Sequence, residues 1–211
     1  MSTPVLAAGN WNSAIVFSAG YAKEQGACTA PYANYRFTSG TSTCSEKHSV
    51  FRFAYDYQFT SILGLEISYG DLAKAEASGE STYEPPHIGS WKMKANGWAI
   101  AATGTVPMGG GLSLKGKIGG VRAEFDESYS FLCSTCSPAG EWTVTDEFRI
   151  HTAKGGLTYG LGLQYDFNKT YAIRAQYENF GKYKLYSPQP GHESTVTVKL
   201  SQLSAGFVLK F

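Results

Sequence analysis

Apolar and polar residues alternate with a period of two along most of the chain, and helical periodicity is nearly absent. The clearest case is a run of five aromatic residues at every second position: Phe51, Phe53, Tyr55, Tyr57 and Phe59. Such alternation is typical of β-strands whose two faces meet different environments. The sequence therefore predicts a protein built almost entirely from strands.

This alternation marks eight candidate strands, near residues 15–21, 51–59, 63–69, 98–106, 112–118, 157–167, 171–177 and 203–211. Short turns near 60–62, 107–111 and 168–170 separate some of them. Long polar segments, which we expect to be loops, lie near 22–48, 71–90, 127–147 and 183–194. Short turns at one end and long loops at the other are typical of outer-membrane barrels, in which the turns are periplasmic and the loops extracellular. We therefore predict an all-β, eight-stranded antiparallel up-and-down transmembrane β-barrel over residues 11–211, after an N-terminal segment at 1–10.

Two stretches depart from the regular pattern. In residues 144–150 the apolar positions are even-numbered, and the phase changes after residues 154–156. A similar change separates residues 196–200 from Leu203. We interpret both stretches as strand extensions above the membrane, with room for a bulge.

The apolar face has to be assigned to lipid or to the interior, because a soluble barrel alternates too. Eight rows of Phe, Tyr, Leu and Ile would overfill an eight-stranded barrel, whose interior is only wide enough for side chains to meet. Small and charged residues fit there better. We therefore expect the aromatic residues to face lipid, with a girdle at the periplasmic interface formed by Tyr57, Phe59, Tyr165, Phe167, Tyr171 and Phe211.

The opposite face carries charges that would lie inside the barrel: Arg52, Asp56, Glu66, Lys115, Lys117, Asp166, Arg174, Glu178 and Lys210. An unpaired buried ion costs several kcal/mol, so most of these groups must pair or reach water. We predict a salt-bridged plug centred on Glu66, Lys117 and Arg174. It serves either a structural role or a gated, narrow conduction path.

Composition narrows the class further. The 24 Gly, 14 Tyr and 12 Phe suit many strands and tight turns. A formal net charge of +1 gives no reason to expect a nucleic-acid partner. No apolar run approaches the roughly 20 residues of a membrane helix. The N-terminus has neither the basic nor the apolar region of a signal peptide, so we expect that an exported chain has already lost it.

The four cysteines lie in polar segments, which favours disulfides and an oxidising compartment. A Cys28–Cys44 bond would close the first loop, and closing a loop of that size contributes about 3 kcal/mol in the chain-entropy model. Cys133 and Cys136 have the spacing of a redox motif. No helix N-terminus accompanies them, so we expect a structural disulfide. Pairing between the loops and a four-cysteine zinc site are the alternatives.

No constellation indicates catalysis, and we expect no cofactor and no resident metal. Of the four histidines, only His48 (next to Ser49) and His151 (next to Thr152) have positions that could serve a lipid-modifying enzyme. Neither lies in a motif that resembles such an enzyme. Solvated histidines in loops are the plainer interpretation, and the chain is not expected to be an enzyme.

The two last hairpins resemble a known family. Residues 160–167 followed by 171–178, the ending at 203–211 and the stretch 114–120 are similar to the transmembrane domain of the outer membrane protein A family. The resemblance implies an eight-stranded barrel, with interior basic residues at Lys117 and Arg174. It also implies that the terminal Phe211 is an assembly signal read by the outer-membrane assembly machinery. Thr103 stands where the family carries an interior Lys. This departure counts against a simple transfer of the family's gating salt-bridge switch to this chain.

Together these observations suggest a monomeric, non-enzymatic protein integral to a Gram-negative outer membrane, with a structural or surface-interaction role. Its partners would be outer-membrane lipid, lipopolysaccharide, and host or cell-surface ligands at the loops. A narrow porin-like channel for ions or small solutes is the main alternative. A lipid A-modifying enzyme is the second.

Overall fold

The structure is a computed structural model that describes residues 12–28, 43–81, 87–133, 143–189 and 192–211. All regular secondary structure in these ranges is β-strand. The strands are β1 (Ser13–Gln25), β2 (Thr43–Ser45), β3 (Lys47–Gln58), β4 (Leu63–Ser81), β5 (His87–Gly109), β6 (Leu112–Cys133), β7 (Thr143–Asp166), β8 (Tyr171–Gln189) and β9 (His192–Lys210). In the described part of the chain, no helix has the length and apolar character needed to cross a membrane.

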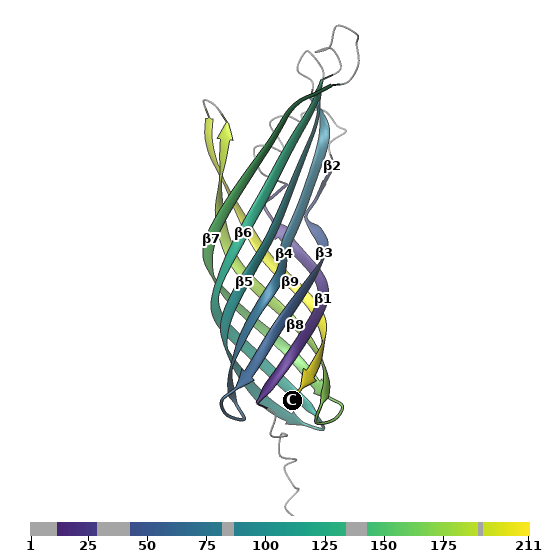
Figure 1. The fold of residues 1–211 in the computed structure, drawn as a ribbon, viewed down its shortest axis with the longest axis vertical. Helices are drawn as coiled ribbons and strands as arrows, with labels where there is room; N and C mark the ends of the chain where they lie inside the picture. The colour runs from purple at the N-terminus through teal and green to yellow at the C-terminus, as the bar shows by residue number, and fades with distance from the viewer. Residues whose placement is uncertain (1–11, 29–42, 82–86, 134–142, 190–191) are drawn as a thin grey trace, which may run out of the picture.

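Eight long strands close into one antiparallel barrel (Figure 1). Their order is β4-β3-β1-β9-β8-β7-β6-β5, and the pairing of β5 with β4 completes the ring. The first and last strands meet along their length, from Ala14 opposite Lys210 to Gln25 opposite Lys199. The short β2 pairs with the upper part of β4. The eight-stranded up-and-down barrel predicted from the sequence is therefore confirmed.

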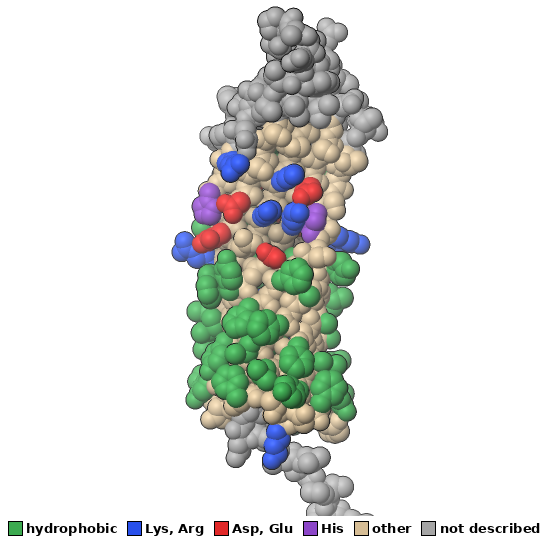
Figure 2. Space-filling model, turned by 45° about the vertical axis from the view of Figure 1, so that its right-hand side comes forward, with side chains coloured by type: hydrophobic (Ala, Val, Ile, Leu, Met, Phe, Trp, Pro, Cys, Tyr) green, Lys and Arg blue, Asp and Glu red, His purple; other side chains and the backbone are tan. Residues whose placement is uncertain are grey.

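The outer wall near the short turns is apolar. Large side chains such as Phe17, Ile118 and Leu157 are 58%, 64% and 73% exposed. The six residues predicted to form the periplasmic girdle all lie on this outer surface: Tyr57, Phe59, Tyr165, Phe167, Tyr171 and Phe211. Figure 2 shows hydrophobic side chains covering the lower part of the visible face, with charged side chains in a belt above them. An apolar band of this kind suits contact with lipid.

Above the apolar band the barrel opens into two facing sheets. The pairing of β7 with β8 ends at Tyr159 opposite Asn179, and that of β3 with β4 ends at Arg52 opposite Gly70. One sheet contains β2, β4, β5, β6 and β7, and the other contains β3, β1, β9 and β8. We call this region the two-sheet part; its sheets extend well beyond the last residues of the apolar band.

The two phase changes come from the chemistry of the interior and not from side chains that change face. Pairing of β6 with β7 continues without a shift through residues 154–156, and pairing of β9 with β1 continues without one between Leu200 and Leu203. The even-numbered Val198 and Leu200 point inward, as do Gln202 and Ser204 further down β9. The faces stay constant, and the interior changes from polar to apolar. The strand extensions are present, and bulges occur at both stretches without causing the phase change. One lies between Val144 and Asp146 of β7, and the other lies in β8 opposite Leu200 and Ser201.

Of the four register shifts in the described strands, two lie close to the level at which the barrel opens. They lie between Asp71 and Ala73 in β4 and between Asn179 and Gly181 in β8. At the second, Gly181 has a φ of +89°, a conformation that glycine adopts without steric cost. Both shifts lie just above the level at which β3 parts from β4 and β7 parts from β8, so they mark the change from barrel to two-sheet part.

The loops are shorter than the sequence suggested, because strands occupy part of each segment that was expected to be a loop. β4 and β5 run through most of residues 71–90. Strand residues also occupy much of 127–147 and 183–194, together with both ends of 22–48. These segments are polar on their outer face, which gave them the composition of loops. The expected N-terminal segment at 1–10 lies outside the described residues.

Candidate functional site

A network of buried charged groups fills the interior at the level of the apolar band. It contains Arg52 and Asp56 of β3, Glu66 of β4, Lys115 and Lys117 of β6, and Arg174 and Glu178 of β8. The strand alternation that places apolar residues against lipid turns these side chains inward. Four cations and three carboxylates therefore share a space from which the wall excludes bulk water.

Glu66 lies between two cations. Its Oε1 is 2.6 Å from Lys117 Nζ, and its Oε2 is 3.2 Å from Arg174 Nη1. Arg174 also binds Asp56, which accepts from Lys115 Nζ at 3.0 Å. The structure thus brings together the three residues that the sequence placed at the centre of the plug.

The third carboxylate, Glu178, closes the network on its upper side. It forms an ion pair with Lys117, whose Nζ lies 2.6 Å away, and accepts a hydrogen bond from Arg52 Nη1 at 2.5 Å. Arg52 also donates to the Ser68 hydroxyl, and Gln176 Nε2 donates to Glu178 at 2.9 Å. Each ion has opposite charges as its neighbours, the condition under which buried ions are tolerated.

The two remaining charged residues predicted for the interior lie lower down. Lys210 Nζ is 2.9 Å from Asp166 Oδ2. Gln164 connects this pair to the network, because it donates to Asp166 at 2.8 Å and accepts from Arg174 at 3.2 Å. All nine charged residues that the sequence assigned to the interior thus belong to one connected set of polar contacts.

The interior glycines do not leave the free space that their size suggests. A Cβ atom at Gly119 would lie 2.0 Å from the Ile100 carbonyl oxygen, and one at Gly160 would lie 2.9 Å from Glu178 Cγ. The cavity beside the network, lined by Thr103 among others, has a volume of about 10 Å³. That is about the minimum space for one water molecule.

The interior of the two-sheet part is apolar instead. Phe125, Met93 and Leu72 from one sheet pack against Phe180 and Leu200 from the other, and all five side chains are buried. The ring centroids of Phe125 and Tyr183 lie 5.1 Å apart across this core. The two levels meet where the Arg52 guanidinium lies 5.0 Å over the Phe180 ring, a favourable cation–π arrangement.

Two buried carboxyl groups in this upper part were missed by the sequence analysis. Glu127 accepts from the Tyr129 hydroxyl at 2.6 Å and from Trp91 Nε1 at 3.4 Å, and burial raises its pKa. Glu24 has no hydrogen-bond partner for either carboxyl oxygen. Burial, followed by the charges of Glu46 and Glu127, raises the pKa of Glu24 to about 8. Glu24 is therefore mostly protonated at neutral pH.

The alternation of inward and outward side chains along a strand could have identified both residues, because the inward residues of one strand are all even-numbered or all odd-numbered. Glu24 shares the even parity of Ser18 and Ala22 along β1, and all three are buried. Glu127 shares the odd parity of Lys115 along β6. Both carboxyl groups lay in segments assigned to loops, where parity was not applied.

The predicted Cys28–Cys44 disulfide is present, with 5.8 Å between the Cα atoms. Glu46 supports the same region by accepting from the main-chain N–H groups of Gly26 and Cys28 at 3.1 and 3.0 Å. The side chains of Cys133 and Cys136 lie outside the part of the chain whose side chains are described, so their predicted bond stays a prediction.

The two histidines considered for catalysis lie apart from each other. His151 Nδ1 is 2.7 Å from Asp126 Oδ1 on the outer surface, and this hydrogen bond raises the His151 pKa. His48 is half-buried, and its Nδ1 has no hydrogen-bond partner. Among the described residues no hydroxyl is bonded to either ring, and no group of acidic, histidine or cysteine side chains could hold a metal ion.

The closed strand order, the apolar outer band and the ion-paired interior define a small transmembrane β-barrel. The chain belongs to the family described as "Outer membrane protein beta-barrel domain", whose sequence model matches residues 4–211. It is thus an integral protein of the outer membrane. No curated protein matches it in sequence.

Solved structures agree with this fold. The outer membrane protein OprG of Pseudomonas aeruginosa is 12% identical, with a TM-score of 0.51 over 95% of this chain and 97% of its own. The outer membrane protein AlkL, determined in lipid bilayers, is 13% identical, with a TM-score of 0.53 over 100% and 96%. The attachment invasion locus protein Ail of Yersinia pestis is 19% identical, with a TM-score of 0.45 over 94% and 98%. At such identities, the first two show the fold alone.

Proposed function

We propose that the chain is a non-conducting outer-membrane barrel whose two-sheet part offers a rigid surface for interaction outside the cell. One observation carries this proposal: β5 and β7 have 23 and 24 residues, whereas about 9–11 residues suffice to cross the outer membrane. About half of each strand therefore extends beyond the lipid. A packed apolar core holds these extensions together, as a fixed binding surface requires.

The interior supports the absence of conduction. Two successive levels close the passage: the ion-paired network around Glu66, and above it the buried rings of Phe125 and Phe180. The cavity beside the network, of about 10 Å³, holds about one water molecule and no hydrated ion. These observations support a structural role for the network.

Planar-bilayer recordings of the refolded protein test conduction. We expect no single-channel currents from the wild-type chain. The same silence is expected from a Phe125→Ala, Phe180→Ala double variant, because the charged network below still blocks the passage. An outer-membrane porin added to the same bilayer checks that insertion is detected. Reproducible wild-type currents that scale with the amount of inserted protein would support the narrow channel instead.

Adhesion measurements test the surface role. Bacteria that express the chain should adhere to epithelial-cell monolayers more than bacteria that lack it. The Phe125→Ala, Phe180→Ala variant should lose much of that gain, because it loosens the core beneath the surface, while a heat-modifiable gel shift shows that its barrel still folds. Equal adhesion with and without the wild-type chain would contradict the surface role.

A further inference from the structure

Five exposed lysines gather on the outer surface of one sheet, directly above the apolar band. They are Lys47 of β3, Lys23 of β1, Lys199 of β9, and Lys182 and Lys184 of β8. All five lie on the sheet that contains β3, β1, β9 and β8. We call this set the lysine cluster.

The register places these charges opposite one another. Lys23 is the direct cross-strand partner of Lys47, and Lys182 is that of Lys199. Like charges directly opposite each other destabilise a sheet. In the described part of the chain, none of the five lysines forms a salt bridge. Two carboxylates are adjacent to these lysines in sequence: Glu24 is buried on the inner face, and Glu46 is engaged with main-chain N–H groups.

The other sheet handles its outer charges differently. There Lys74 is also directly opposite a lysine, Lys94, but carboxylates share that surface: Lys74 lies 2.8 Å from Glu76, and Arg122 lies 3.5 Å from Glu124. His151 is likewise paired with Asp126. The contrast indicates that the lysine cluster is arranged for an anion from outside the chain.

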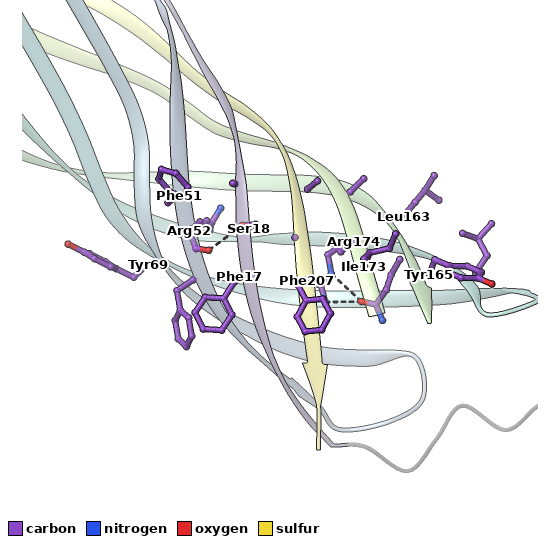
Figure 3. Close-up of a pocket in the computed structure, with 17 residues that line it drawn as sticks. Phe17, Ser18, Phe51, Arg52, Tyr69, Leu163, Tyr165, Ile173, Arg174 and Phe207 are labelled. Carbon is purple, nitrogen blue, oxygen red and sulfur yellow. Dashed lines mark hydrogen bonds between the residues drawn. The ribbon is translucent and has the colours of Figure 1, made fainter. Parts of the chain in front are cut away.

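An apolar groove lies below the lysine cluster on the lipid side of the barrel, with its centre on β8, β9 and β1 and its edges on neighbouring strands of both sides. Ala175, Ala205 and Ala19 stand side by side in register across β8, β9 and β1. Larger side chains border this floor, and Figure 3 shows the rings of Phe17 and Phe207 from β1 and β9. The hollow has a volume of about 860 Å³. Its alanine floor and aromatic borders fit a hydrocarbon chain.

The spacing between groove and lysines matches one half of a bilayer. Lys23 lies four residues along β1 from Ala19, which is about 13 Å at the rise of an extended strand and about 10 Å along the bilayer normal at a strand tilt of about 40°. Half of the apolar band of an outer-membrane barrel, which is about 25 Å tall, is about 12 Å. A lipid whose acyl chain lies over the alanines would therefore place its headgroup beside the lysines.

We propose that this sheet binds a lipid of the outer leaflet whose headgroup carries two phosphates, as that of lipopolysaccharide does. Its phosphates contact the lysine cluster and one acyl chain occupies the alanine groove. Two phosphates match two cross-strand lysine pairs and relieve their mutual repulsion. The proposal rests on the outer-membrane location and not on the surface role proposed above.

The test compares two variants with equal loss of charge, each reconstituted in phosphatidylcholine nanodiscs with bisphosphorylated lipid A. One changes Lys23, Lys47, Lys182 and Lys199 to Gln; the other changes Lys74, Lys92, Lys94 and Arg122 of the opposite sheet to Gln. Native mass spectrometry reports the retained lipid A. We expect at least tenfold weaker retention for the first variant and less than twofold for the second. Equal losses, or no loss, would overturn the proposed site.

A third variant tests the groove separately. Ala205→Phe fills the alanine floor on the lipid side, where the larger side chain does not disturb the barrel interior, and a heat-modifiable gel shift checks folding. Retention of lipid A should fall at least threefold although every lysine is kept. Wild-type retention by this variant would overturn the assignment of an acyl chain to the groove. The wild-type protein should retain lipid A that lacks its phosphates only weakly. This retention should equal that of bisphosphorylated lipid A by the variant in which four lysines of the cluster are changed to Gln.

Discussion

The barrel interior is filled by charged side chains at its lower level and by apolar side chains at its upper level. Within the membrane, Glu66 and Arg174 form ion pairs inside while Phe17 and its neighbours face lipid. Above it, Phe125 is buried while Asp126, the next residue, faces outward. Lipid around the lower wall removes the advantage of burying apolar groups, whereas water around the upper wall restores it. The strand geometry is common to both levels, so the outer solvent decides which residues go inside.

Removing a cation from the lower level should have the largest effect on stability. Arg174→Met leaves Asp56 and Glu66 with one cation each, Lys115 and Lys117. Breaking a buried ion pair by deleting one partner costs about 3–5 kcal/mol. We expect a loss of that size in the free energy of unfolding, measured by urea titration in phospholipid vesicles.

Lys169→Met is the matched control for Arg174→Met, because Lys169 is exposed in the turn between β7 and β8. Its effect should stay within about 0.5 kcal/mol, as for most surface substitutions. A loss below about 1 kcal/mol for Arg174→Met would show that the lower level does not depend on its ion pairs.

Truncating the upper core should cost somewhat less and act more locally. Phe125→Ala opens a cavity between the two sheets, with an expected loss of about 3 kcal/mol. Hydrogen exchange should accelerate mainly in the upper parts of β8 and β9, whose Tyr183, Leu185 and Leu200 line the same core. Ser128→Ala, outside the core on the same strand, is the control. Equal acceleration through the membrane-spanning residues would contradict independent packing of the two levels.

The sequence was most informative where both faces of a strand had distinct chemistry. Alternation placed Lys117 and Arg174 inside, and their opposite charges suggested Glu66 as a partner. It could not pair Arg52 with Glu178, because these residues lie on β3 and β8 and meet only through the diameter and stagger of the closed barrel. In the two-sheet part the same alternation has inverted chemistry, so the apolar Val198 and Leu200 were out of phase with Leu203. Three of the five lysines of the cluster, Lys23, Lys47 and Lys184, were part of segments assigned to loops.

The free energy of unfolding should depend on pH because of Glu24, which is buried in the upper level. Its carboxyl group titrates near 4.5 in the unfolded chain and at about 8 in the folded one. Between these values the folded protein keeps a proton that the unfolded chain has lost, so the free energy of unfolding falls as the pH rises through this window. Below pH 4.5 and above pH 8 this contribution is constant.

Glu24→Gln removes the titration while keeping the shape of the side chain. The variant should match the wild type near pH 4 and be more stable than the wild type above pH 8, in urea titrations across that range. Some slope should remain, because burial also raises the pKa of Glu127. Glu124→Gln, at a half-exposed position paired with Arg122, should keep the wild-type slope. If Glu24→Gln also keeps the wild-type slope, the Glu24 carboxyl group reaches water. The upper interior would then not be the dry, apolar region that contrasts with the charged network below.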